Sequence, residues 1–148
     1  MSDTTDFREA VRRLAGFYAH LTPSALEQLE AFYAPDARFK DPFNEVQGLA
    51  AIRRIFEHMF VALHEPRFVV TQQIVDGPQA FLVWEFRFRM RRFDIRTEQV
   101  IRGGSHLVLD HNGLVTLHRD YWDAAEELYQ KLPGLGALMR WLRRQASR

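Results

Sequence analysis

Apolar residues in the first 65 positions recur every three or four residues, the spacing of amphipathic helices. A first helix is predicted from about Asp6 to His20. A second helix follows Thr22-Pro23, which is an N-cap residue with proline at the first helical position. A short strand around 37–40 separates it from a third helix, which begins after Gly48. The apolar stripes comprise Phe7, Val11, Leu14, Tyr18 and Leu21 in the first helix, Leu26, Leu29 and Tyr33 in the second, and Ile52, Ile55, Phe56, Met59 and Leu63 in the third.

From Pro66 onward the period changes from helical to alternating, which predicts strands over 67–75, 80–91, 96–109 and 114–122. Asp76-Gly77 and Asn112-Gly113 are strong hairpin turns between these strands. Strands longer than the usual five or six residues require a curved or bulged sheet, and Gly103-Gly104 is a natural bulge site. Helices followed by an antiparallel meander predict an α+β fold.

The composition is that of an ordinary globular protein, with 47% hydrophobic and 26% charged residues among 148. No run of about 18 apolar residues is present. The start of the chain, "MSDTTDFREAVRRL", has no apolar signal region, so a cytoplasmic location is expected. The absence of cysteine excludes disulfides and thiolate chemistry. This length suits one domain, predicted over 1–130, followed by a separate C-terminal segment over 131–148.

Charge distinguishes this C-terminal segment from the rest of the chain. Residues 131–148 carry five cations and no acid, whereas the other 130 residues carry 15 basic and 19 acidic groups. A near-neutral body argues against nucleic-acid binding. The segment is predicted to form a basic amphipathic helix that packs on its own domain or on a partner subunit, with an anionic membrane surface as the alternative. Its apolar positions are Leu135, Leu138, Met139 and Leu142.

Sequence motifs for metals and nucleotides are missing. None of the six histidines has a metal-binding spacing, and there is no P-loop, dinucleotide fingerprint or G-x-S-x-G elbow. We therefore expect neither a metal site nor a cofactor. Arg87, Arg89 and Arg91 alternate along one face of the strand over 80–91; a charged or dimer face is the favoured interpretation, and an anion site is the alternative.

Three stretches together carry a family resemblance: "LEQLEAFYAPDARFKDPF" with "GLAAIRRIF", then "GGSHLVLDHNGLV", and finally "TLHRDYWD". The chain resembles the nuclear-transport-factor-two-like superfamily over residues 7–123, especially its SnoaL-like and ketosteroid-isomerase-like branch. The resemblance implies a cone, in which a strongly curved antiparallel sheet wraps three helices around an apolar pocket, and a homodimer formed through the sheet. This fold hosts isomerases, cyclases, dehydratases, epoxide hydrolases and non-catalytic modules, so it does not by itself define the function.

The resemblance to ketosteroid isomerases is incomplete at the positions of the general base and the oxyanion hole. Asp41, in the Asp41-Pro42 step, falls at the position of the general base, although Asp-Pro is also good turn chemistry. Phe17 falls at the position of the oxyanion-hole tyrosine, with Tyr18 beside it. Ser105 falls at the position of the protonated aspartate, whose role it cannot take. True ketosteroid isomerase activity is therefore not expected.

The last hairpin brings a second group of polar residues together. A two-residue turn at Asn112-Gly113 would place Leu107 opposite His118, Ser105 opposite Asp120 and Gly103 opposite Trp122. His118, Asp120 and Trp122 then share one face of the strand, and the resemblance implies that this face lines the pocket. A three-residue turn would shift the register by one residue and set His118 opposite His106. Solvent or a dimer partner is the alternative surrounding for this face.

The predicted function is proton-shuttling chemistry on a hydrophobic small molecule without a cofactor, such as isomerisation, cyclisation, dehydration or epoxide opening. Asp120 and His118 are the acid–base candidates, Asp120 being favoured by SnoaL-like cyclases, with Asp41 on the opposite wall. Asp123 is assigned to helix capping with Glu126. A non-catalytic ligand-binding or dimerisation module is the alternative function. The predicted ligand-binding residues are Phe17, Tyr18, Phe43, Phe56, Met59, Trp84, Ser105, Leu107 and Trp122.

Overall fold

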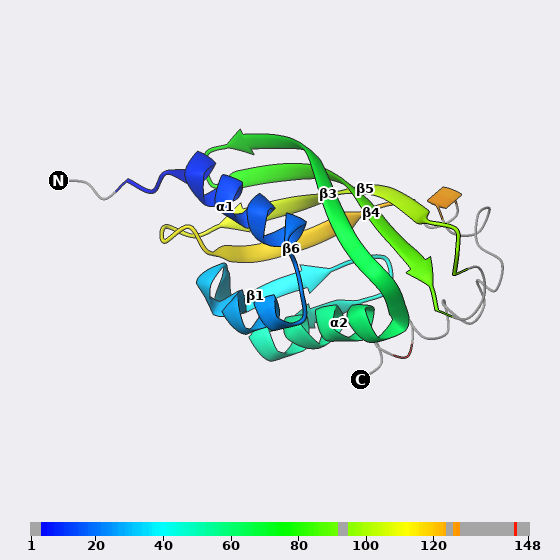
Figure 1. Cartoon of the computed structure of the whole chain (residues 1–148). Helices are drawn as coiled ribbons and strands as arrows, with labels where there is room; N and C mark the ends of the chain where they lie inside the picture. Colours follow the sequence, from blue (N-terminus) through cyan, green and yellow to red (C-terminus); the bar gives the residue numbers. More distant parts are fainter. Residues whose placement is uncertain (1–3, 92–94, 124–125, 128–143, 145–148) are drawn as a thin grey trace.

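The computed structural model describes residues 4–91, 95–123, 126–127 and 144 (Figure 1). In this part of the chain, six strands form one sheet in the order β2-β1-β6-β5-β4-β3. The α+β class predicted from the sequence is confirmed. The elements, in chain order, are α1 (Phe7–Ala19), the 3-10 helix η1 (Ser24–Ala31), β1 (Tyr33–Lys40), β2 (Glu45–Gln47), α2 (Leu49–Ala62), β3 (Leu63–Asp76), β4 (Gln79–Met90), β5 (Gln99–Leu109) and β6 (Val115–Tyr121).

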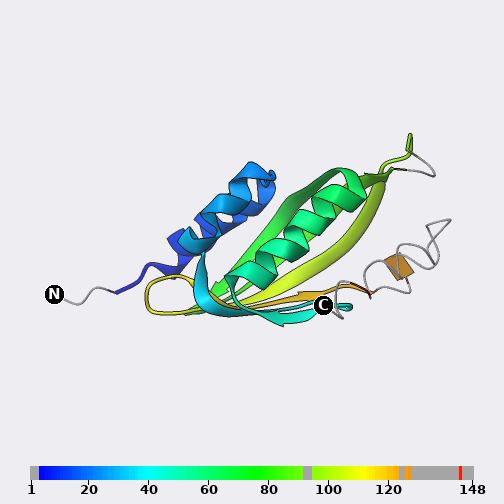
Figure 2. The same ribbon diagram turned by 90° about the horizontal axis from the view of Figure 1, so that it is seen from below.

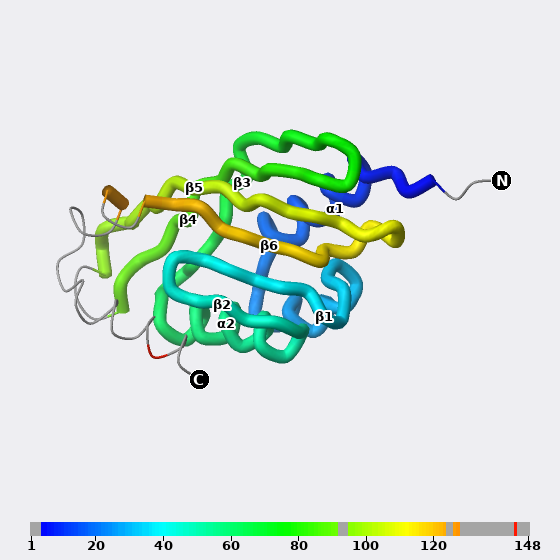
Figure 3. Tube along the Cα trace, turned by 180° about the vertical axis from the view of Figure 1, so that it is seen from behind, coloured from blue at the N-terminus to red at the C-terminus, as the bar shows by residue number. Residues whose placement is uncertain are grey.

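Helices α1 and α2 lie on the same face of a strongly curved sheet, as Figure 2 shows. Helix α1 packs against β3, and α2 packs against β1 and β3. Seen from behind in Figure 3, the strands lie in front of both helices, so the outer face of the sheet is not covered by either of them. The apolar core lies between the helices and the inner face, where Val11 and Leu14 of α1 and Ile52 of α2 are buried.

The sheet is mixed and open, which corrects the predicted antiparallel cone. Strand β1 pairs with β6 in parallel, and Phe39 lies beside His118. The other strand pairs are antiparallel. The meander of β3 to β6 was recognisable from its hairpin turns. The position of β1 in the sheet was not recognisable from the sequence. Its partner β6 comes much later in the chain, after β2, α2 and the three strands β3 to β5.

The second helix differs from its prediction in type and in length. Thr22 Oγ1 accepts the N–H of Ala25 at 3.2 Å, as predicted for the N-cap. The helix is of the 3-10 type and ends at Ala31, however, and Tyr33 is the first residue of β1. Pro35 explains the early end, because the residue before a proline is disfavoured in helical conformation and favours extended backbone. Tyr33 is fully buried at the start of β1.

The predicted bulge at Gly103-Gly104 is wrong. Strands β4 and β5 pair without interruption from Gln79 opposite Val108 to Phe88 opposite Gln99. The register shifts instead in β3 and, near the last turn, between β5 and β6. The two glycines make room for rings, since a Cβ at Gly104 would lie 2.3 Å from a ring carbon of Phe81.

Gly103→Ala is expected to lower the free energy of unfolding by about 2 kcal/mol, the range typical of overpacked cores. The added Cβ would lie 2.7 Å from the Trp84 ring and 2.8 Å from the carbonyl oxygen of Tyr121, and the backbone oxygen cannot rotate away. Gly16→Ala in α1 is the matched control, because an added Cβ there meets no atom within 4 Å. That control should be stabilised by about 0.5–1 kcal/mol. Urea denaturation measures both, and an unchanged Gly103→Ala midpoint would contradict the close approach.

The register of the last hairpin is confirmed, although its predicted turn is wrong. Leu107 pairs with His118 and Ser105 pairs with Asp120. The turn is longer than two residues, because Leu109 pairs with Val115 and Asp110 Oδ1 accepts the N–H groups of Asn112 and Leu114. A register shift beside the turn compensates for this extra length. The predicted pairing therefore holds along the part of β6 that carries the candidate acid–base residues.

The end of β6 leads into the predicted helix start. Asp123 Oδ1 accepts the N–H of Glu126 at 3.1 Å, as an N-cap residue does. The basic segment over 131–148 lies outside the described residues apart from Arg144. None of the described helices is long and apolar enough to cross a membrane.

Candidate functional site

An apolar cavity lies between α2 and the inner face of the sheet, with about 870 Å³ of empty space including the part open to solvent. Side chains from α2, from all of the strands except β2 and from the loop after β1 line it. An apolar lining with a few polar groups is typical of small-molecule sites. The lining residues are Phe39, Asp41, Phe43, Asn44, Ile55, Phe56, His58, Met59, Leu63, Phe68, Trp84, Phe86, Phe88, Ile101, Asp120 and Trp122.

Asp120 is anchored through only one of its two carboxylate oxygens. Oδ1 accepts hydrogen bonds from Nε2 of His118 at 2.6 Å and from Oγ of Ser105 at 2.5 Å. Ser105 Oγ in turn accepts the indole N–H of Trp84 at 2.9 Å. Within the described part of the chain, Oδ2 has no hydrogen-bond partner. The fixed oxygen orients the carboxylate, and the second oxygen remains available to a ligand.

His118 is 3% exposed and connects Asp120 to two tyrosines. Its Nδ1 lies 2.6 Å from the hydroxyl of Tyr33 and 3.2 Å from that of Tyr18, and the two hydroxyls are hydrogen-bonded to each other. Because a carboxylate only accepts, the proton between His118 and Asp120 belongs to Nε2. In the neutral ring, Nδ1 then accepts from Tyr33. Burial raises the pKa of both phenols, which keeps them in the donor form.

Asp41 is a turn residue and also lines the main cavity. Its Oδ1 accepts the backbone N–H groups of Phe43 at 2.8 Å and Asn44 at 2.6 Å, which makes it a turn residue. The amide nitrogen of Asn44 donates to both carboxylate oxygens at 3.1 Å. The same carboxylate lines the main cavity with Asp120. Burial, and then the charge of Asp120, raise the pKa of Asp41 against these hydrogen bonds.

Asp120→Asn is expected to lower the pKa of Asp41, because it removes the second cause of the upward shift and leaves burial in place. A raised pKa in the folded state means that Asp41 stabilises the fold below its ordinary pKa of 3.8, and that this contribution is lost as pH rises through the raised value. A carboxyl NMR titration measures the pKa. Asp36→Asn, at an exposed position on β1, is the control. If Asp120→Asn left the pKa of Asp41 unchanged, the proximity of the two carboxyl groups would be contradicted.

The sequence-predicted residues fall into three places. Asp41, Phe43, Phe56, Met59, Trp84, Asp120 and Trp122 line the main cavity. Tyr18, Ser105 and His118 lie with Asp120 around a smaller inner cavity, which Phe56 and Trp84 also line. Phe17 stacks on Phe32, and Leu107 is fully buried in the core; neither lines either of these cavities.

Several lining or supporting residues were missed. Tyr33 was assigned to a helix, so its contact with His118 could not be anticipated. Asn44 lies in the turn that follows Asp41, and the Asp41-Pro42 step was the available signal for that turn. Phe68 belongs to the inner face of β3 and was detectable from the alternation there. Phe86 and Phe88 alternate with Arg87 along β4 and also line the cavity, but they were not among the predicted ligand-binding residues.

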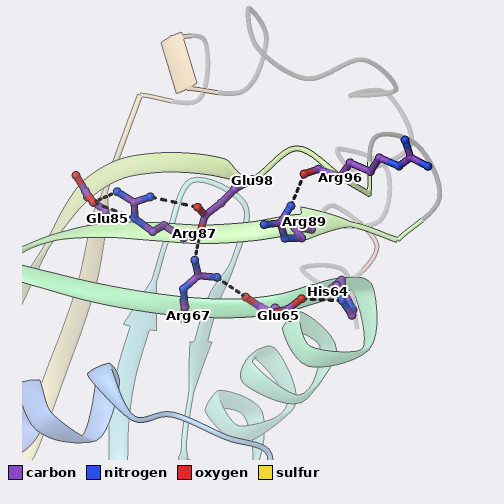
Figure 4. A network of polar contacts seen from close by, with 8 residues as sticks. All are labelled: His64, Glu65, Arg67, Glu85, Arg87, Arg89, Arg96 and Glu98. Atoms are coloured by element: carbon purple, nitrogen blue, oxygen red, sulfur yellow. Dashed lines mark hydrogen bonds and ion pairs between the residues drawn. The ribbon is translucent and has the colours of Figure 1, made fainter.

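None of the three arginines of the row on β4 lines the cavity: Arg87 is paired with acids, and Arg89 and Arg91 donate to backbone oxygens. Arg87 contacts Glu85 at 2.7 Å and Glu98 at 3.4 Å, and Arg67 of β3 also pairs with Glu98 (Figure 4). Arg89 donates to the backbone oxygen of Arg96. These contacts favour a charged outer face over an anion site. Among the described residues, no group of three or more His, Cys, Asp or Glu is placed to hold a metal ion.

Helices on the concave face of a strongly curved sheet, with a cavity between the two layers, define the nuclear-transport-factor-two-like class of fold. Within this class, the chain belongs to the SnoaL-like domain family, whose model matches residues 14–118. No curated protein shows detectable sequence similarity to the chain.

Solved structures share this fold at low sequence identity. A protein from Catenulispora acidiphila with a ketosteroid isomerase-like fold, in complex with trimethylamine, is 18% identical with a TM-score of 0.69, over 84% of this chain and 94% of the other. An LEH-like epoxide hydrolase from M. tuberculosis is 17% identical with a TM-score of 0.68, over 94% and 98%. A candidate SnoaL-like polyketide cyclase from Shewanella putrefaciens is 18% identical with a TM-score of 0.66, over 87% and 89%.

Proposed function

We propose that the protein is an acid–base enzyme that acts without a cofactor on a hydrophobic small molecule. The observation that carries this proposal is the state of Asp120: Oδ1 is fixed by His118 and Ser105, and Oδ2 is without a partner among the described residues, on the wall of an apolar cavity. This oxygen is open to the cavity rather than buried in the core, since 16% of the Asp120 side chain remains exposed, so it can meet a ligand or a water molecule.

In this proposal Asp120 is the general base and Asp41 the general acid. Oδ2 of Asp120 takes a proton from the substrate or from a water molecule, while His118 and Ser105 hold Oδ1 in place. The pKa of Asp41 is raised by burial and by the charge of Asp120, which favours its protonated form as a donor. Two carboxyl groups in one cavity, one acting as donor and the other as acceptor, suit reactions that move a proton from one atom to another. Isomerisation, cyclisation, dehydration and epoxide opening all belong to this type.

The comparisons support the proposal at the level of the fold. An epoxide hydrolase and a candidate polyketide cyclase share the architecture, and one similar structure contains a small organic molecule, trimethylamine. Fold similarity does not define a reaction. The test is therefore a screen of hydrophobic epoxides, enones and polyketide-like compounds for turnover by the wild type and by Asp120→Asn. Binding without turnover would instead support the alternative, a ligand-binding module.

We further propose a cytoplasmic homodimer that associates through the outer face of the sheet. Val69 and Ile74 of β3 and Tyr121 of β6 are 40%, 55% and 46% exposed. The register places all three on the face opposite the cavity. Exposed apolar side chains of this kind are often covered by a partner.

A further inference from the structure

We propose that the cavity selects a hydrophobic tertiary amine in its protonated, cationic form. The inference deepens the proposed function, on which it rests, by naming the class of ligand for the same cavity. It combines two features of the lining that point to the same charge: aromatic rings on several walls, and acidic groups with no lysine or arginine beside them among the described residues.

The first feature is an aromatic lining drawn from several walls. Rings from β1, the following loop, α2, β3, β4 and the end of β6 face one space, and some of them hold each other in place. The centroids of Phe68 and Phe86 are 4.7 Å apart in a stacked pair, and those of Phe43 and Trp122 are 5.5 Å apart. A ring face carries partial negative charge and attracts cations, most strongly where water is displaced. The aromatic residues lining the cavity are Phe39, Phe43, Phe56, Phe68, Trp84, Phe86, Phe88 and Trp122.

The second feature is the acidic character of the polar lining. Asp41, Asn44 and Asp120 line the cavity, and no lysine or arginine does so among the described residues. Asn44 is 5% exposed, and its Nδ2 is directed at Asp41, which leaves its buried Oδ1 without a partner in the described part of the chain. The indole N–H of Trp84 is already donated to Ser105. His58 and Trp122, which also line the cavity, carry N–H groups as well.

These two features together discriminate among ligands by charge. An aromatic lining alone would suit any apolar molecule, and ordinary core packing would produce it as well. A neutral hydrocarbon, however, would leave Asp120 Oδ2 without a donor, and an anion would face the carboxylate of Asp120 in a low dielectric. A protonated tertiary amine brings one N–H for an acceptor and a cationic surface for the rings. These contacts offset the cost of removing the ammonium group from water.

The experiment compares three probes of matched shape at pH 7 by tryptophan fluorescence. N,N-dimethylbenzylamine is the cation, isobutylbenzene is its neutral isostere, and 3-phenylpropanoate is an anion of similar size. The cation is expected to bind about tenfold more tightly than isobutylbenzene, and the anion most weakly. Benzyltrimethylammonium, which has the charge without the N–H, should fall between the tertiary amine and the neutral probe.

Variants of the lining separate the two features. Phe43→Leu keeps an apolar side chain and removes a ring, so it should reduce the preference for the cation several-fold while isobutylbenzene binds nearly as before. Ile55→Leu, at an aliphatic lining position on α2, is the matched control and should leave the ratio unchanged. Equal or tighter binding of isobutylbenzene would overturn amine selectivity and leave the proposed function standing. Absence of binding by all probes would also overturn it, whereas the proposed function is judged separately by the turnover of Asp120→Asn.

Discussion

Asp120→Asn is expected to lower kcat/KM by about a thousandfold for any substrate that the wild type turns over, the usual magnitude for loss of a general base. The substitution tests the base function specifically, because an asparagine oxygen can still accept hydrogen bonds from His118 and Ser105 at the Oδ1 position. The amide nitrogen then takes the place of Oδ2, and it donates where the carboxylate would accept a proton. The anchoring contacts are kept and the reactive oxygen is lost.

The control for this experiment is Asp36→Asn, which makes the same chemical change at an exposed position of β1. It should retain full activity. Both variants should unfold within about 1 kcal/mol of the wild type, since Asp120 keeps its neighbours and Asp36 is at the surface. Activity of Asp120→Asn within about twofold of the wild type, at unchanged stability, would exclude Asp120 as the base. Asp41→Asn under the same conditions then reports whether the second carboxyl group takes part.

The inner face of the last hairpin was predictable from the sequence because the period of a strand is two. Once Leu107 was set opposite His118, the direction of Asp120 followed, and a register shift near Asp110 did not disturb it. The main cavity lies beyond that local rule. Its walls come from segments as distant in sequence as α2 and β6, and which aromatic residues meet there depends on the curvature of the sheet. Alternation alone therefore could not separate Trp84, which lines the cavity, from Leu107, which is sealed in the core.

The network behind the site was hidden for a different reason. Helical periodicity assigned Tyr33 to the second helix. The helix instead ends at Ala31, ahead of Pro35, and Tyr33 is the first residue of β1. Only the parallel pairing of β1 with β6 then brings its hydroxyl to His118. Parallel pairing across this many intervening residues leaves no local signal in the sequence. Asp41 was found through the family resemblance, but its coupling to Asn44 required the turn geometry.

Replacing Tyr18 and Tyr33 together by phenylalanine is expected to cost about 3 kcal/mol of unfolding free energy, against about 1 kcal/mol for each single replacement. Tyr33 and Tyr18 both lie within hydrogen-bonding distance of Nδ1 of His118, at 2.6 Å and 3.2 Å. In either single variant, the remaining hydroxyl can still donate to Nδ1. Only the double variant leaves a buried imidazole nitrogen with no donor. The loss of unfolding free energy in the double variant, minus the sum of the two single losses, therefore measures the cost of leaving that nitrogen without a hydrogen bond.

The four proteins of this double-mutant cycle are the wild type, the two single variants and the double variant. Urea denaturation measures the unfolding free energy of each. Tyr18→Phe combined with Tyr121→Phe is the matched control, because Tyr121 is 46% exposed on the opposite face and the two changes should add. Strict additivity of Tyr18→Phe and Tyr33→Phe would contradict a shared bond to His118. If His118 also positions the carboxylate of Asp120, the double variant should lose kcat more than it raises KM, because the ring that donates to Oδ1 then lacks its anchor at Nδ1 and only Ser105 holds that oxygen firmly. An unchanged kcat in a folded double variant would confine the tyrosines to stability.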